Sequence, residues 1–156
     1  MDNWVWGFSL TALAIAFHVT GVTLLVFALH RFRVRLQRRN LPLPNVIAIL
    51  VVAFTAMGLL LAVLHGLEAA LWAAAYLWLG AFHSPETAIF YSIDSMTTLG
   101  TAGPILCPHW RMMGALEAAN GVLLFGISTA SIFAVMQFYY QHLVLLDRPG
   151  RLGNPK

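Results

Sequence analysis

Charged residues are scarce in this chain of 156 residues. They make up 10% of the sequence, whereas 60% of the residues are hydrophobic and the mean hydropathy is +0.77. A soluble domain of this length cannot bury so much apolar surface, so the composition excludes an ordinary water-soluble fold. We therefore expect lipid to surround most of the chain.

Cysteine and N-terminal positive charge are also nearly absent. Cys107 is the only cysteine, which excludes an intrachain disulfide and a multi-cysteine metal site. Residues 1–4 carry no basic side chain, so we expect no cleavable signal peptide. The net charge of +3 could suit nucleic acid, but five of the nine basic residues directly follow an apolar run. This position favours anionic lipid headgroups over nucleic acid as the partner of Arg31, Arg33, Arg35, Arg38 and Arg39.

Three apolar runs are long enough to cross a membrane, which takes about 20 helical residues. They cover residues 4–29, 45–82 and 112–146, and the Leu-Pro-Leu-Pro segment at 41–44 interrupts the chain after the first. The second run would extend more than about 50 Å as one helix, against a hydrocarbon core of about 30 Å. It predicts either one bent helix, with Gly58 and Gly66 as places to bend, or two spans that reverse near Gly66.

The basic residues decide between these alternatives. The positive-inside rule places the arginine-rich loop, residues 31–39, in the cytoplasm and the N-terminus outside. With one helix over 45–82, the tail at 147–156 is also cytoplasmic, and only Arg111 of the nine basic residues lies outside. Two spans would remove this agreement. We therefore expect one helix.

A short helix is predicted between the second and third runs. Ser84 suits the N-cap, Pro85 the first helical position and Glu86 the positive end of the helix dipole. The helix runs to about Thr97, a dozen residues, which is too short for a span and indicates a re-entrant segment. Its negative C-terminal end and the carbonyl oxygens that follow it would favour a cation.

The sequence Ala-Ile-Phe-Tyr-Ser-Ile-Asp-Ser-Met-Thr-Thr-Leu-Gly at 88–100 resembles the pore helix and filter of two-transmembrane potassium channels. Trp110 matches the tryptophan common after that filter, and Gly121 and Gly126 fall at inner-helix glycines. The resemblance covers roughly residues 55–140. It implies an all-α membrane protein with an outer helix, a re-entrant pore helix with a filter loop, an inner helix and one extra N-terminal helix. The domains would be 1–40, 41–146 and 147–156.

The resemblance also implies a function: a homotetramer, and not an enzyme, that passes potassium across a bacterial inner membrane without a cofactor. The cations would bind at Thr98, Leu99 and Gly100, and Asp94 and Trp110 would lie behind the filter. The implied filter residues are Thr97, Thr98, Leu99, Gly100, Thr101, Ala102 and Gly103.

The filter departs from the family pattern at three positions. Thr101 replaces the tyrosine, Ala102 the second glycine and Gly103 the acid of T-T-V-G-Y-G-D. We therefore expect relaxed selectivity, with a non-conducting subunit of another pore complex as the alternative. A third alternative is a membrane cytochrome with haem between His18 and His65.

Ionisable residues within the apolar runs should face partners rather than lipid. His65 and Glu68 are one turn apart, as are Glu117 and Asn120, and we expect these two pairs to meet and to brace the outer helix against the inner one. Because a lone carboxylate at membrane depth is costly, Asp94 should be hydrogen-bonded to filter amides, partly protonated or in contact with water. Gly121 and Gly126 indicate close helix packing or a gating hinge. Because the arginines lie outside the crossing segments, we expect no voltage sensor.

Overall fold

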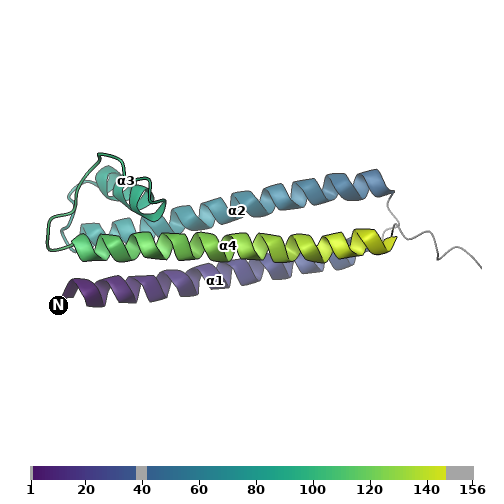
Figure 1. Cartoon of the computed structure of the whole chain (residues 1–156), viewed down its shortest axis with the longest axis horizontal. Helices are drawn as coiled ribbons and strands as arrows, with labels where there is room; N and C mark the ends of the chain where they lie inside the picture. Colours follow the sequence, from purple (N-terminus) through teal and green to yellow (C-terminus); the bar gives the residue numbers. More distant parts are fainter. Residues whose placement is uncertain (1, 38–41, 147–156) are drawn as a thin grey trace, which may run out of the picture.

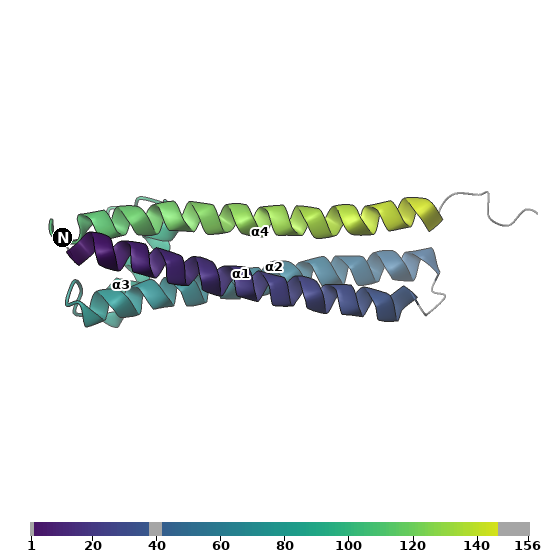
Figure 2. The same ribbon diagram turned by 90° about the horizontal axis from the view of Figure 1, so that it is seen from below.

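The computed structural model describes residues 2–37 and 42–146, which form four α-helices and no strand. Three helices have 36 residues each: α1 (Asp2–Gln37), α2 (Leu43–Trp78) and α4 (Arg111–Leu146). They run side by side, with α2 antiparallel to α1 and α4 (Figures 1 and 2). The fourth helix, α3 (Pro85–Met96), has 12 residues and lies at the end of the bundle where α1 begins. The predicted all-helical class is confirmed.

The three long helices each contain a segment that is long and apolar enough to cross a membrane. These segments are Asn3–Phe32, Pro44–Trp78 and Arg111–Gln137. A helix of 36 residues is about 54 Å long, which exceeds a hydrocarbon core of about 30 Å. The helices therefore tilt in a bilayer or extend beyond its apolar region.

The second apolar run forms one helix, as expected, and not two spans. Pro42 precedes α2 in an extended conformation, with a proline at the first or second helical position, which suits a helix start. The helix ends at Trp78, four residues before the predicted end at Phe82. Gly80 explains this difference, because its φ of 70° is a left-handed conformation that glycine adopts readily at a helix C-terminus.

The placement of Arg31, Arg33 and Arg35 in a loop was wrong. α1 continues through Arg31, Arg33 and Arg35 to Gln37. Arginine is a good helix former, and no proline or glycine lies between Arg31 and Gln37. The guanidinium of Arg31 lies 4.5 Å from the centroid of the Phe27 ring, a cation–π contact one turn along the same helix. Arg38, Arg39 and the tail at 147–156 lie outside the described residues.

The buried core divides into two apolar groups along the bundle. The group nearer α3 includes Trp72, Tyr76 and Met113, and the group toward the other end includes Met57 and Val135. Polar side chains interrupt the first group, and these belong to the site described next. Many large apolar side chains remain exposed on the three long helices, as expected for surfaces that face lipid or other subunits.

Candidate functional site

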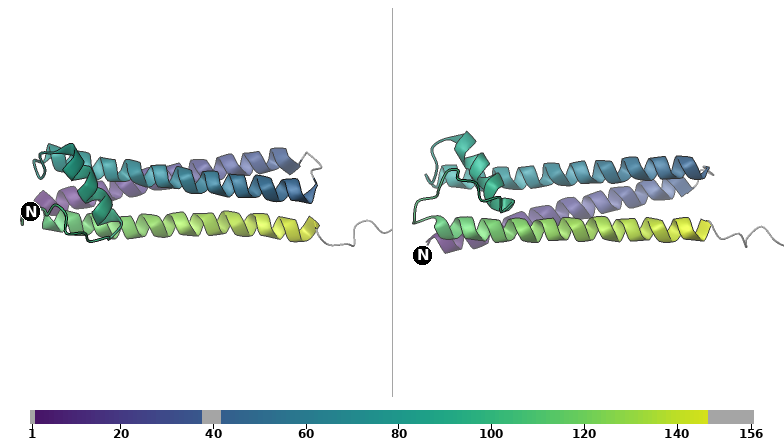
Figure 3. Two further views of the ribbon diagram at one scale, coloured as in Figure 1. Left: turned by 90° about the horizontal axis from the view of Figure 1, so that it is seen from above. Right: turned by 45° about the horizontal axis from the view of Figure 1, so that its top comes forward.

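The helix α3 has the start that its sequence predicts. Ser84 is its N-cap, and the side-chain oxygen of Ser84 accepts a hydrogen bond from the backbone N–H of Thr87 at 3.4 Å. Glu86 lies in the first turn. The helix packs against α2 and α4, beside the first turns of α4 (Figure 3). Its buried residues Ala88, Ser92 and Met96 follow one face at intervals of four, which orients the helix on the bundle.

The loop at residues 97–103, here called the 97–103 loop, leaves the C-terminal end of α3. Thr97 caps the helix, and its hydroxyl donates to the carbonyl of Ile93 at 2.7 Å. Thr98 has a φ of 54° and Gly100 a φ of 67°, and Thr98 is the one non-glycine residue with positive φ in the described part of the chain. Such a conformation costs a residue with a Cβ roughly 1–2 kcal/mol. The hydrogen bonds of the helix end hold Thr98 in it: the N–H of Thr98 donates to the carbonyl of Ser95 and the N–H of Leu99 to the carbonyl of Asp94, each at 3.0 Å.

Asp94 bonds to the 97–103 loop. One carboxylate oxygen of Asp94 accepts from the backbone N–H of Thr101 at 3.0 Å and from the Thr101 hydroxyl at 2.9 Å. The backbone carbonyl of Asp94 accepts from the N–H of Leu99 at 3.0 Å. Asp94 therefore holds the loop at two points, through its backbone at Leu99 and through its side chain at Thr101. The side chain of Thr101 thus turns back to the carboxylate of Asp94.

The two glycines that the resemblance singled out, Gly121 and Gly126 of α4, have different surroundings. Gly121 is buried against the end of α3, and a Cβ at this position would lie 2.2 Å from the carbonyl oxygen of Met96. Gly126 is exposed, and a Cβ there would meet nothing within 4 Å. Gly121 thus permits close packing of α3 on α4, whereas Gly126 plays no packing role within one chain. Trp110 lies just before α4 and packs against the core nearer α3.

A buried carboxyl joins α2, α3 and α4. Glu117 is fully buried, and its two carboxylate oxygens accept hydrogen bonds from the Tyr76 hydroxyl at 2.8 Å and from the Ser92 hydroxyl. This group, here called the Glu117 cluster, anchors α3 to both neighbouring helices. Sequence reasoning identified Glu117 but missed Tyr76 and Ser92. Tyr76 lies two turns after Glu68 on the same face of α2, which is the one pattern that could have indicated it.

Glu68 belongs to a second and separate group, here called the His–Glu–Ser cluster. Its carboxylate contacts Nδ1 of His18 at 2.7 Å and Nδ1 of His65 at 3.1 Å. The Nε2 atoms of both histidines contact the hydroxyl of Ser128, each at 3.1 Å. The prediction that the pair His65 and Glu68 would meet the pair Glu117 and Asn120 was therefore wrong. Each pair does bridge helices, but the partners are His18, Ser128, Tyr76 and Ser92.

Asn120 was expected to take part in the same contacts. It is 1% exposed, and neither its Oδ1 nor its Nδ2 has a hydrogen-bond partner among the described residues. The side-chain N–H of Trp72 is likewise buried and without a partner in that part of the chain. Glu117 and Asn120 are one turn apart on the same face of α4. Only Glu117 reaches Tyr76 of α2, because α4 turns that part of the face toward α2.

The histidines of the haem alternative do lie together, with ring centroids 5.0 Å apart. Both nitrogens of each ring contact Glu68 or Ser128. The two rings therefore share partners, and they do not direct one nitrogen each toward an iron ion from opposite sides of a porphyrin. This geometry does not favour a haem between them.

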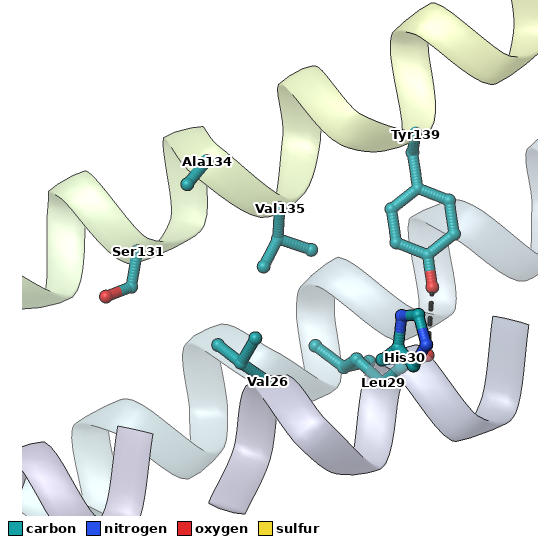
Figure 4. A pocket seen from close by; sticks show the side chains of 7 residues that line it. All are labelled: Val26, Leu29, His30, Ser131, Ala134, Val135 and Tyr139. Atoms are coloured by element: carbon teal, nitrogen blue, oxygen red, sulfur yellow. Dashed lines mark hydrogen bonds between the residues drawn. The ribbon is translucent and has the colours of Figure 1, made fainter. Parts of the chain in front are cut away.

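A cavity of about 340 Å³ lies at the opposite end of the bundle from α3, between α1 and α4. Figure 4 shows its seven lining side chains, among them Val26, Val135 and Tyr139. The Tyr139 hydroxyl donates to the backbone carbonyl of Leu29 at 3.2 Å, which ties the two helices together. No residue of the predicted filter or of either polar cluster lines this cavity, so it lies apart from the candidate site.

The comparisons with known proteins give no family for the chain: no protein-family model, no curated protein and no solved structure matches it.

Proposed function

We propose that the chain is one subunit of a tetrameric cation channel, in which the 97–103 loop is one quarter of the ion filter. The observation that carries the proposal is α3 itself: a capped helix of 12 residues, too short to span, that ends in a loop with positive φ at Thr98 and Gly100. Residues with φ of alternating sign turn successive carbonyl groups toward the same side of the backbone. Carbonyls of Thr98, Leu99 and Gly100 directed to one side would supply the oxygen ligands that a dehydrated cation needs.

The electrostatics of α3 support a cation at this place. The C-terminal end of a helix carries a partial negative charge, and the last turn of α3 contains no basic residue that would neutralise it. Irregular backbone at membrane depth is tolerated where it is enclosed by protein or faces water. A ring of four loops satisfies this condition, because each loop is then covered by its neighbours and faces a central pore.

The exposed side chains of α4 support assembly. Val122, Leu123 and Phe125 are between 39% and 58% exposed on one chain, beside the glycine at 126 whose surface is open. In the proposed tetramer the four α4 helices line the inner cavity and pack on each other, while α2 and α1 lie outside. The loop enters from the outer face, and the N-terminus lies outside the cell.

The loop sequence supports passage of potassium with relaxed selectivity. Thr98, Leu99 and Gly100 retain the inner part of the filter pattern, whereas Thr101 and Ala102 depart from it. The outer part is fixed by the bond from Thr101 to Asp94 and lacks an aromatic ring to set the pore width. Sodium is then excluded less strictly than by a filter braced with tyrosine.

A reversal-potential measurement in planar bilayers tests the proposal. The wild-type protein should conduct both potassium and sodium with a modest preference for potassium. The double variant Thr101→Tyr with Ala102→Gly should increase that preference. Gly58→Ala is the matched control, because its site is open and α2 lies outside in the proposed tetramer, and it should leave the permeability ratio unchanged.

The departures at Thr101 and Ala102 also support a second candidate, a subunit that assembles with another pore protein and does not conduct alone. The two candidates differ in one result. A folded tetramer that passes no cation in the bilayer experiment contradicts the first proposal and supports the second.

A further inference from the structure

The His–Glu–Ser cluster lies between three spanning helices and takes no part in the 97–103 loop. His18 comes from α1, His65 and Glu68 from α2, and Ser128 from α4. His18 and Glu68 are fully buried, Ser128 is 6% exposed, and the His65 side chain is 12% exposed. The four side chains form a closed ring of contacts, from Glu68 through each histidine to Ser128.

The ring has too few hydrogens for its four contacts. With Glu68 ionised and both imidazoles neutral, each Nδ1–H donates to one carboxylate oxygen, which leaves a bare lone pair on each Nε2. Both Nε2 atoms lie 3.1 Å from the oxygen of Ser128, whose hydroxyl has one hydrogen to donate. One of these two contacts then joins two lone pairs. In a core that excludes water, this unsatisfied contact requires an additional cation, either a proton or a metal ion.

We propose that His18, His65 and Glu68 bind a divalent transition-metal ion of the zinc class, with Ser128 as the outer support of both histidines. The ion occupies the place of the two Nδ1 hydrogens, bound by both Nδ1 atoms and by the carboxylate. Each imidazole remains neutral, because its hydrogen moves from Nδ1 to Nε2. Both Nε2–H groups then donate to Ser128, whose oxygen has two lone pairs, and every contact of the ring is satisfied.

The distances fit this exchange. The ligand atoms of the three residues all lie within 4.8 Å of one another, and the two contacts of Nδ1 with the carboxylate are 2.7 and 3.1 Å. Around a tetrahedral zinc ion with bonds of about 2.0–2.1 Å, neighbouring ligand atoms are roughly 3.3 Å apart. Side-chain rotations thus suffice. The bond from each Nε2–H to Ser128 is the outer-shell bond that orients metal-binding histidines.

The donor set determines the class of ion. Two imidazole nitrogens with one carboxylate suit zinc and its neighbours in the first transition row, whereas calcium and magnesium prefer oxygen ligands. An apolar groove of about 310 Å³ reaches His65 and is also lined by Met96, Thr97 and Phe125. Through this groove His65 is the member of the cluster that is open to the surface. The bound ion would join α1 to α2 and does not depend on channel function.

Metal analysis of the purified full-length protein tests this site. The protein should carry an affinity tag without histidine, be incubated with Zn²⁺ and be dialysed before its metal content is measured. We expect one zinc ion per chain in the wild type, and none above background in Glu68→Gln or His18→Gln. His83→Gln is the matched control, because His83 is exposed and outside the cluster, and it should keep its zinc. Ser128→Ala should weaken zinc binding by about 10–100-fold.

Cobalt gives a second readout on the wild type alone, so the test does not depend on folded variants. Co²⁺ in a tetrahedral site of nitrogen and oxygen ligands absorbs in the visible range, and added Zn²⁺ should abolish that absorption. A folded wild-type protein that binds neither ion overturns the proposal, and the extra positive species is then a proton. Zinc that persists in Glu68→Gln and disappears in His83→Gln also overturns it, because the ion is then bound by surface histidines.

Discussion

Replacement of Gly121 by alanine should separate the end of α3 from α4. The new Cβ would lie 2.2 Å from the carbonyl oxygen of Met96 and 2.7 Å from its Cα, where real contacts are longer than 3.0 Å. The nearest atoms are backbone, so no side-chain rotation can relieve the overlap. The C-terminal turn of α3 must move by about 1 Å, and the 97–103 loop begins at that turn.

The magnitude follows from two opposed terms. Overpacking of a close contact costs about 1–3 kcal/mol, and alanine gains about 0.5–1 kcal/mol over glycine within a helix. Gly121→Ala should therefore destabilise the protein by up to about 2.5 kcal/mol. Gly126→Ala meets nothing within 4 Å, so it should stabilise α4 by about 0.5–1 kcal/mol.

Thermal unfolding of the two variants in the same detergent is the direct comparison, because they place the same side chain on the same helix five residues apart. Gly121→Ala should unfold at a lower temperature than the wild type, and Gly126→Ala at an equal or higher one. Hydrogen exchange in residues 97–103 should become faster in Gly121→Ala alone. Equal stability of the two variants would refute the packing of α3 on Gly121.

Three further substitutions test the contacts that hold α3 and its loop. Asp94→Ala removes the acceptor of both Thr101 bonds, so the 97–103 loop should exchange its amide hydrogens faster while the three long helices keep their protection. Tyr76→Phe leaves a buried oxygen of Glu117 without its donor and should lower the free energy of unfolding by about 1–3 kcal/mol, measured by denaturation in detergent. Ser84→Ala removes the N-cap of α3 and should cost about 0.5–2 kcal/mol, seen as faster exchange in the first turn of that helix.

Each of these substitutions has a control. Glu86→Ala changes an exposed carboxyl on the same helix as Asp94 and should leave loop exchange unaltered. Tyr140→Phe changes an exposed tyrosine and should leave stability unaltered. Ser84→Asp keeps a capping oxygen and should restore the first turn of α3. If a control behaves like its partner variant, the contact assigned to that partner does not contribute as described.

Local signals in the sequence were sufficient for the elements of the fold. Ser84 and Pro85 define the start of α3 because capping and fixed φ act within one turn. The single helix α2 followed from charge distribution, a property of the whole chain. The arginines were misplaced because the change from apolar to charged residues marks the membrane surface, not the end of a helix. Within the described residues the helix continues past that change to Gln37.

The contacts between helices could not be predicted in the same way. Spacing by one turn shows that two residues share a face, but it does not show which residue of the next helix meets them. Glu68 meets His18 of α1 because α1 crosses α2 at that level, and the sequence contains no local sign of that crossing. Asp94 was the exception, because its bond to Thr101 joins residues only seven positions apart in the sequence.

The proposed filter is tested most directly by modification of a cysteine placed at its outer end. Cys107 is the only cysteine and is exposed, so Cys107→Ser gives a cysteine-free background. In that background a cationic thiol reagent should block the cation current of Ala102→Cys. It should leave the current of His83→Cys unchanged, although His83 is exposed and lies in the segment just before α3. An equal effect on both variants, or an undiminished current through fully modified Ala102→Cys, would contradict a cation path along the 97–103 loop.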